Sequence, residues 1–107
     1  MRDDRERLQD ILDTIKQIEK YAEPGKDRFM KDELIQTWVV HHLIIIGEAS
    51  SRVSQETKEK YPDLPWVGTI DVRNIITHEY FRIALNIIWM IVKDNLPDLK
   101  EKIENIL

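Results

Sequence analysis

The chain has 107 residues, of which 42% are hydrophobic and 34% are charged, and it contains no cysteine. This length suits one domain over residues 1–107, and the composition excludes a disordered chain because it supplies enough apolar surface for a core. Disulfide bonds and thiolate metal sites are also excluded, and a formal net charge of −4 argues against strong electrostatic binding to nucleic acid.

The first predicted helix spans Asp3–Ala22. Its apolar residues recur three and four positions apart, as one face of a helix requires: Leu8, Ile11, Leu12, Ile15, Ile18 and Ala22. Asp3 or Asp4 can cap its start, and Glu23-Pro24-Gly25 ends it. The first ten residues lack the apolar stretch of a secretory signal, and no apolar run is long enough to span a bilayer. We therefore expect a cytoplasmic protein with no membrane segment.

The second predicted helix is the longest and spans Asp27 to about Val53. Its middle is apolar on more than one side, because Val40, Ile44 and Ile45 add a second face to the row that points to the core. A helix that is apolar on several sides is buried on several sides. In a chain of this size, that pattern predicts an oligomer.

Two adjacent histidines, His41 and His42, lie in the middle of this helix. Neighbouring positions point about 100° apart, so the pair cannot chelate one metal ion from a regular helix, and three ligands are not evident. We expect no metal site and no cofactor, and we interpret both side chains as partly buried polar groups near a dimer interface.

A connection over Ser54–Pro65 follows, in which Gln55–Tyr61 predicts a short charged helix and Pro62 and Pro65 interrupt regular structure. Trp66, at the start of the next helix, is predicted to anchor the core by aromatic burial rather than to stack on a nucleic-acid base.

The last predicted helix spans Ala84–Leu96, and Asn95-Leu96-Pro97 kinks or restarts it before an amphipathic stripe that continues to Leu107. Together with a third helix over Trp66–Phe81, these segments predict an all-α fold. The expected architecture is an up-and-down four-helix bundle with a short extra helix or a kinked C-terminal helix.

The third predicted helix contains four polar side chains of catalytic type within eight residues: Arg73, Asn74, His78 and Tyr80. At about 100° per residue, Arg73 and Tyr80 are nearly eclipsed, and Asn74 and His78 form the next row. The aliphatic residues of the segment fall on the opposite side, where a core would need them. Residues 66–93 contain three basic and two acidic side chains, so this is the only part of the chain that is not net acidic.

That polar face suits cleavage of a phosphodiester without a metal ion. Arginine offers a permanent charge and paired N–H donors to phosphate oxygens, histidine can give or take a proton near neutral pH, and asparagine can orient either one. From residue types alone, the alternative of a solvated helix face without chemistry stays open.

The order of these residues resembles a known signature. Arg, then Asn, three more residues, His, one residue and Tyr, on the third helix of a small all-α chain, resembles the HEPN superfamily and, within it, the HepT-like toxin branch. Further matching stretches are Ile46-Gly47-Glu48-Ala49, Tyr61-Pro62-Asp63-Leu64-Pro65-Trp66, and Trp89 with Leu96-Pro97. The similarity covers nearly the full chain.

The resemblance implies the toxin of a toxin–antitoxin pair, a metal-independent endoribonuclease whose composite active site forms where a homodimer brings two motif helices into one cleft. In this scheme His78 is the general acid or base, Arg73 binds the phosphate and Asn74 orients them. Glu48 would lie near the cleft, where its carboxylate could orient Arg73 or His78.

Tyr80 has two implied roles. It would hydrogen-bond the RNA substrate, and it would accept AMP from a partner, a minimal nucleotidyltransferase antitoxin that silences the toxin.

The same residues allow an alternative function. The chain could be a non-catalytic subunit of a two-chain nucleotidyltransferase, with a polar face that binds a nucleotide or the partner chain. A plain structural dimerisation module is a third possibility.

Overall fold

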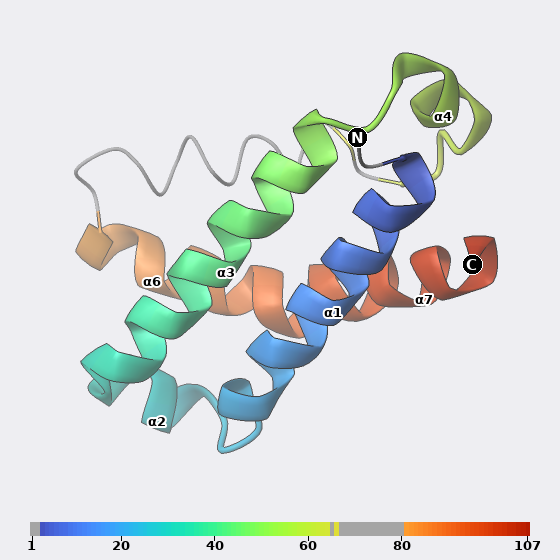
Figure 1. The fold of residues 1–107 in the computed structure, drawn as a ribbon. Coiled ribbons are helices and arrows are strands. Elements are labelled where there is room, and N and C mark those ends of the chain that lie inside the picture. The colour runs from blue at the N-terminus through green and yellow to red at the C-terminus, as the bar shows by residue number, and fades with distance from the viewer. Residues whose placement is uncertain (1–2, 65, 67–80) are drawn as a thin grey trace.

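The computed structural model describes residues 3–64, 66 and 81–107, the last segment with side chains from Leu85 onward. These residues form helices and no strand (Figure 1): α1 (Asp4–Ala22), α2 (Lys26–Lys31), α3 (Glu33–Ser51), α4 (Gln55–Lys60), α6 (Phe81–Met90), a π-helical segment η1 (Ile91–Asn95) and α7 (Leu96–Ile106). The predicted all-α fold is confirmed. The third predicted helix lies, apart from its first and last residues, outside the described residues.

Two long helices, α1 and α3, pack side by side and antiparallel, and the run formed by α6, η1 and α7 crosses behind them (Figure 1). Their apolar rows meet in one continuous core. The most deeply buried aliphatic side chains come from α1, α3, α6 and α7: Ile11, Ile15, Ile18, Val39, Ile46, Ile88 and Ile103. Among the described residues, no helix is both long and apolar enough to cross a membrane.

Helix α1 begins at Asp4, one residue after the predicted start, and ends at Ala22 as predicted. Asp3 keeps an extended backbone, and its carboxylate accepts a hydrogen bond from the backbone N–H of Glu6 at 2.8 Å, which caps the helix. After Ala22 the chain turns at Gly25, whose φ of 103° lies in the left-handed region that glycine adopts without strain.

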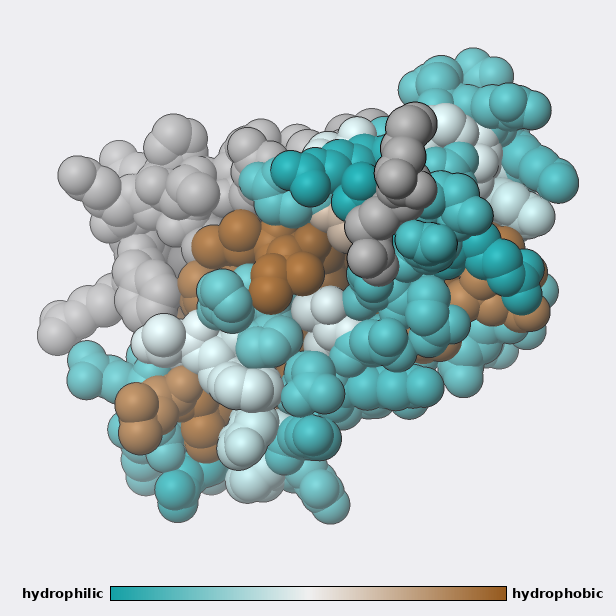
Figure 2. Space-filling view, in the orientation of Figure 1, coloured by the Kyte–Doolittle hydropathy of each residue, from teal (hydrophilic) through white to brown (hydrophobic). Residues whose placement is uncertain are grey.

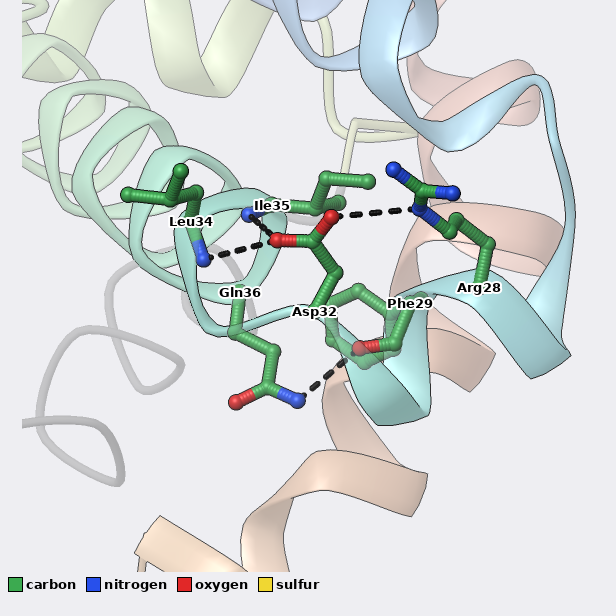
Figure 3. A network of polar contacts seen from close by, with 6 residues as sticks. All are labelled: Arg28, Phe29, Asp32, Leu34, Ile35 and Gln36. Carbon is green, nitrogen blue, oxygen red and sulfur yellow. Dashed lines mark hydrogen bonds and ion pairs between the residues drawn. The ribbon is translucent and has the colours of Figure 1, made fainter.

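The prediction of a single helix over Asp27–Val53 is wrong, because the helix is interrupted at Asp32. This residue has an extended backbone, with φ −116° and ψ 104°. Its carboxylate accepts hydrogen bonds from the N–H groups of Leu34 at 3.0 Å and Ile35 at 3.3 Å, and it also pairs with the Arg28 guanidinium at 3.1 Å (Figure 3). The carboxylate of Asp32 therefore caps a new helix, α3, instead of continuing α2.

The break allows α2 to fold back onto the core. Phe29, on α2, is fully buried, and its ring centroid lies 5.3 Å from that of Trp89 on α6. The buried Gln36 side chain of α3 donates a hydrogen bond to the backbone carbonyl of Phe29 at 2.9 Å, which fixes the corner between the two helices (Figure 3). A straight helix could not have placed Phe29 in this position.

A π-helical segment in the C-terminal run allows the chain to accommodate Pro97 without a clash. Proline has no N–H, and its ring clashes with the carbonyl four residues earlier in a regular α-helix. The segment η1 lies just before this position, and Pro97 occupies the first turn of α7, where its missing N–H is not needed. The helix thus restarts at Leu96, as the sequence predicts.

A polar contact joins the start of α1 to the start of α4. The Asp4 carboxylate accepts hydrogen bonds from the Ser54 backbone N–H at 3.0 Å and from the hydroxyls of Ser54 and Thr57. The hydrogen bond from the Ser54 side chain, followed by that from Thr57, holds the pKa of Asp4 below its ordinary value. The folded state therefore favours the ionised carboxylate more strongly than the unfolded state does.

We predict that Asp4→Asn lowers the free energy of unfolding by roughly 1 kcal/mol at pH 7, because the hydrogen bonds lose their charged acceptor. A lowered folded-state pKa stabilises the protein above the unfolded pKa, near 4, and this contribution is lost as the pH falls through the folded value. Urea unfolding of both proteins should therefore give a difference at pH 7 that shrinks below pH 4. Asp63→Asn, at an exposed carboxylate, is the control and should leave the free energy of unfolding unchanged at both pH values.

Candidate active site

Four of the five predicted site residues, Arg73, Asn74, His78 and Tyr80, lie outside the described residues. Their roles stay predictions. The structure does describe the residues that precede and follow the motif segment, and the fifth predicted residue, Glu48.

Trp66 precedes the motif segment and is firmly anchored. Only 9% of it is exposed, and its indole N–H donates a hydrogen bond to the backbone carbonyl of Tyr61 at 2.9 Å. Leu64, two residues earlier in the chain, is also buried. The prediction that Trp66 is a core anchor is confirmed, and its burial leaves no free ring face for stacking on a base. On the other side of the motif segment, α6 begins at Phe81.

Glu48 lies on α3 at the edge of a hollow between α3 and α1. The hollow has a volume of about 340 Å³. Glu48 is half-buried, and its side chain or backbone takes part in interactions, so it is not a free residue. Glu48 is the one predicted site residue that the structure describes, and we therefore call this cavity the Glu48 hollow.

Charged side chains of both signs surround the Glu48 hollow. Arg7, Asp10 and Asp13 reach it from α1, and Arg52 comes from the end of α3. Asp13 also accepts a hydrogen bond from Gln9 at 3.0 Å. With Glu48, the lining contains three carboxylates and two guanidinium groups. Such a site can orient a cationic or proton-transferring side chain, but its charge alone gives no strong attraction for phosphate.

No group of three histidine or acidic side chains among the described residues could hold a metal ion. His41 and His42 lie together on α3, their ring centroids 5.3 Å apart and nearly perpendicular. His41 is exposed and His42 is half-buried, so only His42 matches the prediction of a partly buried side chain.

A second cavity on the α1–α3 face was not predicted. It lies near the other end of the same helix pair, where the exposed Tyr21 of α1 packs edge-on against Trp38 of α3, and Trp38 in turn packs against His42. Trp38 keeps the helical spacing of the core residues of α3, so the sequence pattern does not distinguish it from them, and no prediction was made for Tyr21. The signal in the sequence is weak: Tyr21 lies one turn after Gln17, so the two residues share a face of α1.

Apolar side chains remain partly exposed on two helices. On α3, these are Val40, Ile44 and Ile45, and Figure 2 shows hydrophobic surface over the middle of this helix. On α6, Ile87 is 44% exposed and Met90 is 59% exposed. The second apolar face predicted for the long helix is thus not fully covered within one chain.

Comparison with known proteins gives the family. The profile described as "Ribonuclease HepT-like" matches residues 11–106. The chain is 34% identical to "Putative RNase MJ1380" of Methanocaldococcus jannaschii, over 96% of this chain and 95% of that protein. It is 33% identical to "Probable ribonuclease HepT" of Thermococcus cleftensis, over 98% and 96% of the two chains.

A longer relative contains the same region as one part. The chain is 36% identical to "Gamma-glutamylcyclotransferase and putative RNase MJ0434" of Methanocaldococcus jannaschii, over 94% of this chain and 46% of that protein. No solved structure matches the chain at a significant level. The family match and the relatives above 30% identity agree with the resemblance inferred from the motif: the chain belongs to the HepT-like ribonuclease family and is a ribonuclease.

Proposed function

We propose that this ribonuclease is the toxin of a toxin–antitoxin pair and cleaves RNA internally without a metal ion. The observation that supports this most directly is the motif Arg73, Asn74, His78 and Tyr80 in a chain of the HepT-like family. His78 transfers the proton of the attacking or leaving oxygen, Arg73 stabilises the charge on the phosphorus centre, and Asn74 orients them. Glu48, from α3, positions Arg73 or His78 as a supporting residue.

The active site is shared by two copies of the chain. One motif supplies one histidine, whereas cleavage requires a base for the attacking hydroxyl and an acid for the leaving oxygen. Two motifs in one cleft supply both groups. The partly exposed apolar side chains of α3 and α6 support self-association, because large exposed apolar surface is typical of contacts between protein chains.

The partner is a minimal nucleotidyltransferase antitoxin, which silences the ribonuclease by attaching AMP to Tyr80. A bulky, charged group on a tyrosine two residues from His78 would block RNA and add negative charge at the cleft. The chain works as one domain over residues 1–107, in the cytoplasm, where its RNA substrate is found. The relative in which this region makes up about half of a longer protein supports its role as an independent unit.

We predict that His78→Ala lowers the rate of RNA cleavage by roughly 10²–10⁴-fold and Arg73→Ala by about 10²-fold or more, because each removes a transition-state contact. Asn74→Ala and Glu48→Gln should cause smaller losses, and a chelator should leave the wild-type rate unchanged. Gel analysis of labelled RNA measures the rates. Arg5→Ala, at an exposed arginine on α1, is the matched control and should retain full activity. Equal cleavage by wild type and His78→Ala would remove the assignment.

A second prediction concerns the shared site. If each site needs both copies of His78, random dimers from equal amounts of wild-type and His78→Ala chains should retain about one quarter of the wild-type activity, since only doubly wild-type dimers are active. Independent sites would retain about one half. Co-expression with two different tags, followed by activity measurement on the mixture, separates these values, and a result near one half would contradict the composite site.

A third prediction tests the antitoxin. Cytoplasmic expression of the chain alone should stop growth. Co-expression with the proposed nucleotidyltransferase antitoxin should restore growth and add about 329 Da, the mass of one AMP group, to the chain. Tyr80→Phe should abolish the mass increase, whereas Tyr61→Phe should not. Rescue without any change in mass would show that the partner acts by another route.

A further inference from the structure

The cavity near the beginning of α3 has the properties of a binding site for a flat ring. It has a volume of about 770 Å³, within the usual range for ligand sites. We call it the aromatic pocket. Its aromatic and apolar lining comes from α1 and α3: Tyr21, Leu34, Ile35, Trp38, His41 and His42. Tyr21 is 46% exposed and Leu34 is 83% exposed.

The rings of the aromatic pocket are held in place by the protein itself. The Trp38 indole N–H donates a hydrogen bond to the backbone carbonyl of Gln17 at 2.9 Å. The Nδ1 atom of His42 lies 2.7 Å from the carbonyl oxygen of Trp38, and because a carbonyl only accepts, Nδ1 must carry the proton. The Trp38 and His42 rings are tilted by 33° with centroids 4.3 Å apart, and Trp38 packs edge-to-face with Tyr21 at a centroid distance of 4.8 Å. A ligand would therefore find these rings already ordered.

The polar groups at the rim favour a ligand with polar edges. Thr37 lies at the rim, and His42, whose Nδ1 atom is hydrogen-bonded to Trp38, has Nε2 as its second ring nitrogen. Arg28 is paired through Nε with Asp32, so the rim has no net charge there, while the outer nitrogens of the guanidinium point away from the carboxylate (Figure 3). An aliphatic side chain would contact the rings and leave these polar groups unused, whereas a nucleobase has both a flat face and hydrogen-bonding edges.

The position of the pocket connects it to the candidate active site. Trp38, His41, Ile45 and Glu48 are three and four residues apart on α3 and so share one face, which Arg52 continues just after the helix ends. Trp38 is ten residues from Glu48, or about 15 Å along the helix. A few nucleotides of a single strand can cover this distance. The aromatic pocket and the Glu48 hollow thus lie along one seam between α1 and α3.

We propose that the aromatic pocket binds an unpaired base of the RNA substrate, a few nucleotides from the bond that is cleaved. This inference rests on the proposed ribonuclease site, and it identifies the substrate as single-stranded RNA at this point. Only an unpaired base can leave its own stack and lay its face on one of these two rings, with its edge toward the other, because the rings are inclined to each other by 62°. Because the rim is neutral, ring contacts rather than charge provide the affinity.

Binding is tested on the full chain with His78→Ala, so that RNA is not consumed. Single-stranded hexaadenylate should quench tryptophan fluorescence, mainly that of Trp38, because Trp66 and Trp89 are each only 9% exposed. Adding Tyr21→Leu should raise Kd about tenfold, the effect of losing one stacked ring, whereas Tyr21→Phe should bind as before. A hairpin RNA whose adenines are all paired within a long stem should neither quench Trp38 nor respond to Tyr21→Leu.

Equal Kd values for Tyr21→Leu and Tyr21→Phe, with quenching that survives Trp38→Phe, would overturn the proposal. So would a loss of partner-protein binding in Tyr21→Leu with unchanged RNA affinity, since the pocket would then be a protein contact. If Tyr21→Leu alters folding, the His78→Ala chain with Tyr21 intact is used instead. Quenching by single-stranded RNA but not by duplex RNA then supports the proposal, and equal quenching by both overturns it. Absence of cleavage by wild type would instead count against the proposed function, because the binding assay uses an inactive chain.

Discussion

The packing of α1 against α3 is the contact on which the described surface depends. Ile15 and Ile18 from one helix and Val39 and Ile46 from the other are almost completely removed from water, and this burial provides most of the driving force that holds the pair together. The hydrogen bond from Trp38 to the carbonyl of Gln17 adds a directional constraint, because it fixes how far one helix can slide along the other. Both cavities of this face lie along the seam, so their separation is set by the core rather than by flexible loops.

The second constraint is the carboxylate of Asp32, whose pKa is lowered first by the hydrogen bond from the N–H of Ile35 and then by those from Leu34 and Arg28. Asp32 has an extended backbone and caps the start of α3, and it therefore determines the direction in which α3 leaves α2. Phe29 can then reach the core, and Leu34 remains on the outside at the edge of the aromatic pocket. A single polar residue in an otherwise helical pattern thus decides which apolar side chains are buried and which lie exposed at the edge of the aromatic pocket.

Much of this fold follows from the sequence, since the row from Leu8 to Ala22 predicts α1 and aromatic burial predicts the position of Trp66. The break at Asp32 was missed because apolar residues keep their helical spacing through it, although Asp before Glu-Leu-Ile is a typical capping pattern. The catalytic motif lies outside the described residues, so its geometry stays a prediction. The aromatic pocket could not be predicted from periodicity, because that pattern separates core from surface but does not reveal which exposed side chains of two helices meet.

Charge limits how a protein of this composition can hold RNA. The chain is net acidic, and the Glu48 hollow contains more carboxylates than guanidinium groups, so binding through many phosphate contacts is unfavourable. Two of the proposed features would reduce this difficulty. A shared cleft would double the basic residues of the motif segment at one place, and a stacked base would add affinity that salt does not screen. An acidic ribonuclease that depends on both would bind RNA tightly only as a dimer and only where a strand is unpaired, and its specificity would then follow from RNA structure rather than from overall charge.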